Sequence, residues 1–171
     1  MIQKCLTLFL LKALQNGAGM WSGICFGIIA GIFAGDMWIK NRIEEKGVEG
    51  ETKELFGGRL LLRKYHNTGA MLNLGSRKRA LVAGVSVALT AFVFVLFLLT
   101  LGKRGNNLLK VGLSFLLGGA FSNTYDRLKR KYVVDYVSFG VKWKRLRGIV
   151  FNISDFCIIT GALLTALGSG R

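Results

Sequence analysis

The aspartates of this sequence stand where acidic side chains are costly. Four lie at or near the ends of long apolar segments: Asp36, Asp126, Asp135 and Asp155. A carboxylate at membrane depth costs roughly 2.5–3.5 kcal/mol on insertion scales, and such residues tend to be functional. The five glutamates instead share one polar stretch, residues 44–54, which predicts a solvated surface. The aspartates therefore predict a site built from carboxylates.

Asp135 and Asp155 differ from the other two because neither has an obvious cation beside it in the sequence. Two unpaired carboxylates brought together near a low-dielectric boundary share a proton, since both cannot easily ionise. One carboxylate can then activate a water molecule while its partner acts as the acid. This pair predicts peptide hydrolysis by an aspartic mechanism.

Polar residues at helical spacing flank these aspartates. Asn123, Asp126 and Arg127 are three and four residues apart, so they share one helical face. Asn152 and Asp155 repeat the Asn-x-x-Asp spacing on the next apolar segment. We expect both groups to support the carboxylate pair.

Two charge pairs admit two interpretations. Asp36 and Lys40 are four residues apart, and Arg127 follows Asp126 directly. Each pair either anchors a helix end at the membrane interface or supports the site, and the sequence leaves both interpretations open.

The elements that must position these residues are membrane-spanning helices. The chain has 171 residues, 51% of them hydrophobic and none of them proline, and this length favours a single domain, residues 1–171. The run 80–102 carries no charge, and about 20 such residues cross a bilayer. We expect four spans, at about 13–39, 80–102, 108–125 and 148–170, which predicts an all-α membrane protein.

The alternation of four spans brings the polar residues together. The end of the first span, the end of the third and the start of the fourth lie on one membrane face, together with the loops 40–79 and 126–147. All four aspartates and Asn67 therefore converge there. Within the first loop, residues 57–75 predict short strands, and Asn67–Gly69 predicts a turn.

The charge distribution is strongly basic, with a formal net charge of +15. Residues 41–79 hold nine Lys and Arg and residues 126–147 hold eight, against three in residues 103–110. The positive-inside rule alone would place the two large loops in the cytoplasm. We expect these loops to contact anionic membrane lipids, and we do not expect a nucleic-acid partner.

Metal ligands are scarce. The three cysteines, at positions 5, 25 and 157, form no metal or disulfide spacing, and His66 is the single histidine. We expect neither a metal nor a cofactor. Residues 1–14 are too short to span a membrane, and we interpret them as an interfacial helix or an upstream extension.

Five motifs in order resemble one family. They are Asp-x-x-x-Lys at 36–40, Asn-Thr-Gly-Ala at 67–70, Asn-x-x-Asp-Arg at 123–127, Val-Val-Asp-Tyr at 133–136 and Phe-Asn-x-x-Asp at 151–155. Together with four spans, they resemble the lipoprotein signal peptidases (signal peptidase II). The resemblance runs from about residue 36 to the end of the chain.

The resemblance implies roles for particular residues. The catalytic pair of the family falls on Asp135 and Asp155. Substrate-binding or supporting roles fall on Asp36, Lys40, Asn67, Gly69, Asn123, Asp126, Arg127 and Asn152.

It also implies an activity and a fold. Family members cleave a prolipoprotein just before a cysteine that carries a diacylglyceryl group, need no metal and are blocked by the peptide antibiotic globomycin. Their fold is a four-helix bundle with a small extracytoplasmic β-cradle. They lie in the bacterial cytoplasmic membrane with the active site near the extracytoplasmic face. This orientation is opposite to the one that the positive-inside rule predicts for the two basic loops, and we expect the orientation of the family.

Four residues depart from the family pattern. Ser122 and Lys131 stand where glycine is common, Phe156 where serine is frequent, and Tyr136 where phenylalanine is usual. They surround the pair without replacing it, so they bear on substrate or inhibitor fit more than on catalysis.

Two other function classes stay open. A non-catalytic relative that binds lipidated peptides would keep the same binding residues. A small proton- or cation-linked transporter would also use buried acids, but it favours acids at several depths along a pore, whereas these gather at one face.

A glycine stripe runs along the first span, at every fourth residue from Gly19 to Gly35. Such a stripe permits close helix packing. We expect it to pack inside the bundle, with dimerisation as the alternative, and we expect a monomer.

Overall fold

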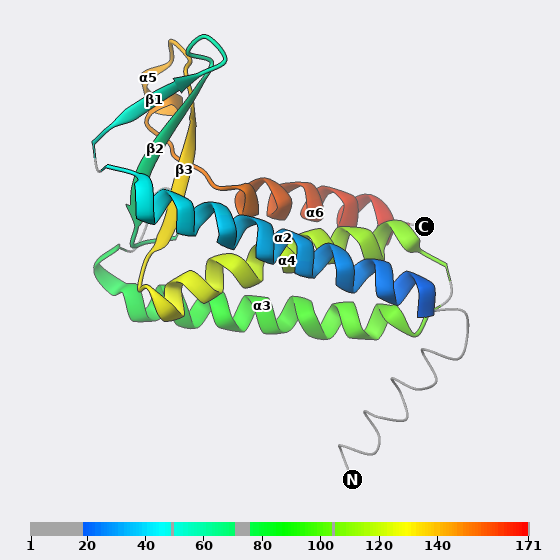
Figure 1. The fold of residues 1–171 in the computed structure, drawn as a ribbon. Coiled ribbons are helices and arrows are strands. Elements are labelled where there is room, and N and C mark those ends of the chain that lie inside the picture. The colour runs from blue at the N-terminus through cyan, green and yellow to red at the C-terminus, as the bar shows by residue number, and fades with distance from the viewer. Residues whose placement is uncertain (1–18, 49, 71–75, 104, 171) are drawn as a thin grey trace.

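The computed structural model describes residues 19–48, 50–70, 76–103 and 105–170. Residues 1–14, interpreted above as an interfacial helix or an extension, lie outside these ranges. The main helices are α2 (Gly19–Lys46), α3 (Arg79–Leu101), α4 (Asn107–Lys129) and α6 (Ile153–Ser169). They run side by side in one bundle, and a small sheet rises from one end of it (Figure 1).

Helix α4 is the centre of the bundle, and it packs against α2, α3 and α6. Its buried side includes polar residues as well as leucines, among them Ser114, Ser122 and Asn123. Helices α4 and α6 pack closely because glycines on each helix let the backbone of the other approach. A Cβ atom on Gly161 would lie 2.4 Å from the backbone nitrogen of Leu116, and one on Gly119 would lie 2.5 Å from the carbonyl oxygen of Ser154.

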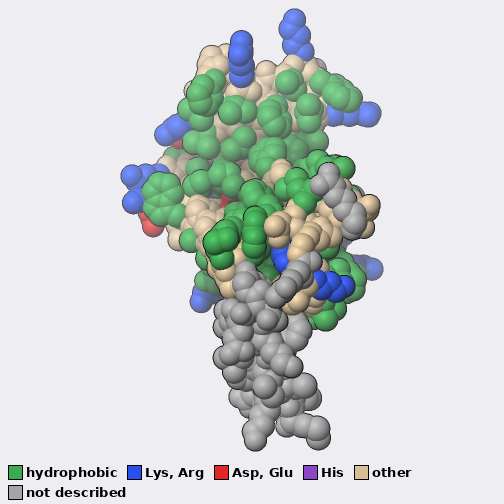
Figure 2. Space-filling model, turned by 90° about the vertical axis from the view of Figure 1, so that its right-hand side faces the viewer, with side chains coloured by type: hydrophobic (Ala, Val, Ile, Leu, Met, Phe, Trp, Pro, Cys, Tyr) green, Lys and Arg blue, Asp and Glu red, His purple; other side chains and the backbone are tan. Residues whose placement is uncertain are grey.

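The apolar surface of the bundle is large. Within the described part of the chain, two segments are long and apolar enough to cross a membrane by length and composition, Gly19–Lys46 and Ser76–Leu101, while α6 is a shorter apolar helix. The exposed side chains of α3 include Leu89, Phe92 and Leu99. Figure 2 shows hydrophobic side chains covering much of one face, with Lys and Arg projecting at its margins.

A helix lies at each of the four expected positions, with boundaries that differ from the expected ones; that each helix crosses a membrane stays a prediction. Helix α2 continues through Lys46, seven residues past the expected end at 39. Helix α6 begins at Ile153 rather than 148, because Phe151 pairs with Val137 of the sheet and Asn152 caps the helix.

The sheet has three antiparallel strands in the order β1-β2-β3. They are β1 (Thr52–Leu55), β2 (Leu60–Asn67) and β3 (Val133–Phe139). The expectation of strands within 57–75 is confirmed for β2 only. β1 lies in the charged stretch that was expected to be a plain solvated surface, and β3 was not predicted from its residues. At the tip, Gly140 donates to Arg59 O at 2.8 Å, and a Cβ on Gly140 would collide with the backbone of Gly58.

The glycine stripe does not pack inside the bundle. A Cβ atom added at Gly23, Gly27, Gly31 or Gly35 would meet nothing within 4 Å. The expectation of internal packing is therefore wrong for these four positions. Their side of α2 faces away from the described part of the chain.

Candidate active site

Asp135 is buried on β3, with 2% of its surface exposed. Two amide groups hold its carboxylate: Asn67 Nδ2 donates to Oδ2 at 3.1 Å, and Asn152 Nδ2 donates to Oδ1 at 2.7 Å. The antiparallel register pairs Asp135 with Tyr65, which brings the end of β2 and its Asn67 next to the carboxylate. Neither partner carries a charge, so Asp135 has hydrogen bonds without an ion pair.

Asp155 lies in the first turn of α6 and is held by the cap of that helix. Asn152 accepts from the backbone N–H of Asp155 at 2.9 Å, and Asp155 Oδ2 accepts from the backbone N–H of Asn152 at 3.0 Å. This reciprocal capping box fixes the start of α6 and the carboxylate together. Asn123 Nδ2 donates to the other oxygen, Oδ1, at 2.9 Å.

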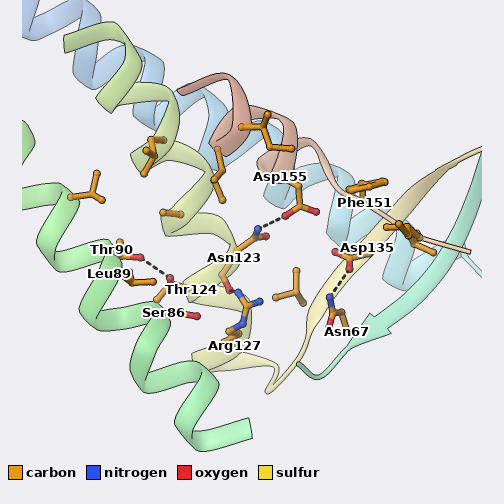
Figure 3. Close-up of a pocket in the computed structure, with 18 residues that line it drawn as sticks. Asn67, Ser86, Leu89, Thr90, Asn123, Thr124, Arg127, Asp135, Phe151 and Asp155 are labelled. Atoms are coloured by element: carbon orange, nitrogen blue, oxygen red, sulfur yellow. Dashed lines mark hydrogen bonds between the residues drawn. The ribbon is translucent and has the colours of Figure 1, made fainter. Parts of the chain in front are cut away.

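The two carboxylates line one cavity of about 420 Å³ between the bundle and the sheet. Figure 3 shows Asp135 and Asp155 entering it from β3 and α6, with Asn123 and Arg127 on the α4 side. Burial, with Asp155 nearby, raises the pKa of Asp135 to about 7, and the hydrogen bonds from Asn67 and Asn152 oppose this shift. Asp135 therefore holds a proton at neutral pH far more readily than an exposed carboxyl does.

Lys40 connects the supporting acids to this pair. Its ammonium group lies 2.7 Å from Asp36 Oδ2 and 3.1 Å from Asp126 Oδ2, and all three side chains are fully buried. The same ammonium donates to Asn123 Oδ1 at 2.9 Å. Because Asn123 donates in turn to Asp155, Lys40 fixes the amide orientation that presents Nδ2 to the carboxylate.

Comparisons with known proteins agree with this arrangement. The sequence model of the family described as signal peptidase (SPase) II matches residues 28–169. A lipoprotein signal peptidase of Caldicellulosiruptor bescii is 34% identical over 138 residues, which cover 80% of this chain and 84% of the relative. One from Enterococcus faecalis is 30% identical over 141 residues, covering 82% and 84%. The chain belongs to the signal peptidase II family.

Solved structures share the fold. Two structures described as bacterial membrane enzymes match with TM-scores of 0.72 and 0.70, each at 22% identity and over 85% of this chain. They cover 86% and 91% of the respective neighbours. The helical bundle with its small sheet is therefore a fold already seen in a membrane enzyme.

Within this signal peptidase, three hydroxyl groups surround Asp36. Ser122 and Ser154 each donate to Oδ2 at 2.6 Å, and Tyr136 donates to Oδ1 at 2.8 Å. Ser122 and Tyr136 were noted above only as departures from the family pattern, and Ser154 was missed. Serines are too frequent in helices for their type alone to indicate such a role.

The expected pair of Asp126 with Arg127 is not formed. Asp126 Oδ1 instead accepts from Arg130 at 2.8 Å, and its other oxygen faces Lys40 and the backbone N–H of Val134. Residues four apart on a helix pair more easily than adjacent ones, which explains why Asp126 pairs with Arg130. Arg127, left without this partner, lines the cavity.

Arg127 links α4 to the turn after β2. It donates to the carbonyl oxygens of Asn123 and Gly69, each at 3.2 Å. Asn67 Oδ1 accepts from the backbone N–H of Gly69 at 3.0 Å, which confirms the predicted turn. Arg127 Nε is buried and has no hydrogen-bond partner among the residues that the structure describes, so this donor is available to a group that enters the cavity.

The remaining departures have physical explanations. Lys131 adopts a positive φ of 71°, a conformation that glycine reaches without strain, so the glycine that the resemblance leads one to expect would fit this backbone. The ring of Phe156 meets Phe139 edge to face, with ring centres 6.2 Å apart, and lies tilted against Phe151 at 5.5 Å.

Among the described residues, no cluster of three or more His, Cys, Asp or Glu is suited to a metal ion. His66 contacts Glu44 at 2.7 Å and stacks on Tyr132. Cys25 and Cys157 are free thiols.

Proposed function

We propose that Asp135 and Asp155 are the catalytic pair with which this signal peptidase II removes signal peptides from prolipoproteins. The observation that carries this assignment is a pair of carboxylates in one cavity, Asp135 buried and Asp155 half-buried, each held by an amide donor and neither neutralised by an ion pair within the described chain. Asp36 and Asp126, by contrast, are both neutralised by Lys40.

The pair would work with one shared proton. We assign the base to Asp155, because it lies at the N-terminus of α6, where the helix dipole and a backbone N–H favour an anion. We assign the acid to Asp135, whose pKa is raised to about 7. Asp155 takes a proton from water, the water oxygen attacks the scissile carbonyl carbon, and Asp135 protonates the carbonyl oxygen. As the resulting diol collapses, Asp155 gives its proton to the amide nitrogen and Asp135 takes a proton back from a diol hydroxyl. The C–N bond breaks, the carboxylic acid and the amine leave, and both aspartates return to their starting states.

The rest of the cavity would hold the substrate. Its wall is mainly apolar, with Leu89 and Val93 from α3 and Ile158 and Ile159 from α6. Such a surface suits the acyl chains on the lipidated cysteine, and burial is worth about 0.8 kcal/mol per CH₂. Arg127 and Asn123 would donate hydrogen bonds to peptide carbonyls beside the pair.

We further propose that the single domain, residues 1–171, crosses the bacterial cytoplasmic membrane with four helices as a monomer. The sheet lies at one end of the bundle (Figure 1), and Asp135 and Asp155 line the cavity there. We assign this end to the extracytoplasmic face. The basic loops would then contact anionic headgroups of membrane lipids, which reconciles their charge with this orientation. Acids grouped at one end suit a hydrolase better than a transporter, whose acids would follow a pore.

The test is expression in a bacterial host depleted of its own signal peptidase II. We expect trimming of a lipidated prolipoprotein, poor trimming of the same prolipoprotein without its diacylglyceryl group, and inhibition by globomycin. Binding of the lipidated substrate without trimming would indicate a non-catalytic relative. A proton flux in reconstituted vesicles that depends on the aspartates, with no cleavage, would indicate a transporter.

A further inference from the structure

A second cavity lies away from the carboxylate pair, between the end of α2 and the β1–β2 hairpin. Its volume is about 80 Å³. Five cationic residues line it: Arg42, Lys46, Lys53, Arg63 and Lys64. Among the described residues that line it, Glu51 is the one acidic residue. The cavity is therefore strongly basic, and it is far smaller than the roughly 300–1,000 Å³ of pockets that hold drug-sized ligands.

Carboxylates of the described chain neutralise only part of this charge. Lys64 pairs with Glu44 at 3.2 Å, and Arg42 lies 3.6 Å from Glu45. Lys46, Lys53 and Arg63 form no ion pair with any described residue. Lys46, Lys53 and Arg63 therefore line the cavity without a paired carboxylate, and Glu51 is the one acidic residue among its described lining residues.

Arg63 supplies an independent indication of a ligand. Its Nε atom is buried and has no hydrogen-bond partner within the described ranges of the chain. Buried donors are nearly always satisfied, and leaving one unpaired costs about 1–3 kcal/mol. A guanidinium matches the oxygens of a phosphate group with two parallel hydrogen bonds. A small oxyanion in the cavity would satisfy this donor and the surplus charge together.

The position along α2 indicates where such an anion comes from. Trp38, one turn before the cavity, is 62% exposed, and the guanidinium of Arg42 lies 5.8 Å from the centre of its ring. An exposed tryptophan at the end of an apolar helix marks the membrane–water interface. Arg42 and Lys46, one and two turns farther along, then reach the depth of the lipid phosphates.

We propose that this basic cavity binds the phosphate group of an anionic membrane lipid, with Lys46, Lys53 and Arg63 as its ligands. The proposal rests on the membrane crossing of α2 proposed above, and it does not depend on the catalytic pair. A lipid held there would fix the β1–β2 hairpin against the end of α2.

The test is native mass spectrometry of the full chain in detergent with added phosphatidylglycerol, diacylglycerol with the same acyl chains, or inorganic phosphate. We compare the wild type, Lys53→Gln/Arg63→Gln, and a matched control, Lys142→Gln/Arg145→Gln, which removes the same charge from exposed positions outside the cavity. Lys46→Gln serves as a second cavity variant if the double variant does not fold.

We expect the wild type and the control to retain phosphatidylglycerol. The double cavity variant should retain it at least about tenfold less and Lys46→Gln about fivefold less, since each interfacial cation contributes about 1 kcal/mol to anionic lipid binding. Equal retention by the cavity variants, or equal retention of diacylglycerol by the wild type, would overturn the site. Inorganic phosphate that binds as tightly as the lipid would overturn the lipid as its source. Prolipoprotein cleavage, measured on the same samples, reports separately on the catalytic proposal.

Discussion

The ammonium group of Lys40 lies 2.7 Å from a carboxylate oxygen of Asp36, one turn away on α2, and both side chains are fully buried. The same ammonium faces Asp126 at 3.1 Å. One cation therefore holds two acids inside the protein, and its hydrogen bond to Asn123 extends this network to Asp155. The network is both a structural tie between α2 and α4 and a support for the catalytic pair.

Replacing Lys40 should destabilise the protein strongly. Lys40→Met leaves the carboxylates of Asp36 and Asp126 buried without their shared cation, and breaking a buried ion pair in this way costs about 3–5 kcal/mol. The free energy of unfolding in detergent measures the effect. Lys129→Met, at an exposed position on the same bundle, should change it by less than about 0.5 kcal/mol. Equal effects of the two substitutions would contradict the role of the network.

Two glycines should respond oppositely to alanine. Gly161→Ala places a Cβ atom 2.4 Å from backbone of α4, so the helices must separate, at a cost of about 1–3 kcal/mol or more. Gly27→Ala meets nothing within 4 Å and should be neutral or slightly stabilising. Thermal unfolding of both variants provides the comparison. Marked destabilisation by Gly27→Ala would show that the stripe on α2 is packed after all.

Cleavage should decline above a pH of about 7. The pKa of Asp135 is raised to about 7, so above that pH its proton is lost and the pair no longer holds the acid. Asn67→Ala removes a hydrogen bond that favours the ionised form, so it should raise the pKa and move the decline to higher pH. Profiles of kcat/KM against pH show both effects, and Asn106→Ala at the far end of α4 should leave the profile in place. A decline that moves to lower pH in Asn67→Ala would contradict this account.

Replacing Asn123 or Arg127 should slow cleavage without abolishing it. Asn123→Ala removes a donor to Asp155, and Arg127→Ala removes donors that face the cavity. Losing one such donor costs on the order of 1–3 kcal/mol, which corresponds to roughly ten- to hundredfold slower cleavage. Cleavage rates in reconstituted vesicles measure the loss. Unchanged rates would exclude these residues from the site, and complete loss would mean that they do more than position.

The sequence was sufficient to predict the convergence of the site. Asp36, Asn67, Asp135 and Asp155 do meet at one end of the bundle, because alternating helices return the chain there. Strand β3 was not predicted, since its main partner, β2, lies about 70 residues earlier and one short apolar patch does not reveal that pairing. The expected partner of Asp126, the adjacent Arg127, was wrong: residues four apart share a helical face, and Asp126 pairs with Arg130. The hydroxyl groups on Asp36 depend on helix packing, which no local pattern encodes.

The central claim is that Asp135 and Asp155 together perform the hydrolysis. Its most direct test is the cleavage of a diacylglyceryl-modified prolipoprotein in vesicles by Asp135→Asn and Asp155→Asn, with Glu54→Gln on the exposed strand β1 as the control. We predict that each aspartate variant folds and binds substrate yet cleaves none, because one carboxylate cannot serve as both base and acid, while the control cleaves normally. Near-normal cleavage by either aspartate variant would contradict the assignment.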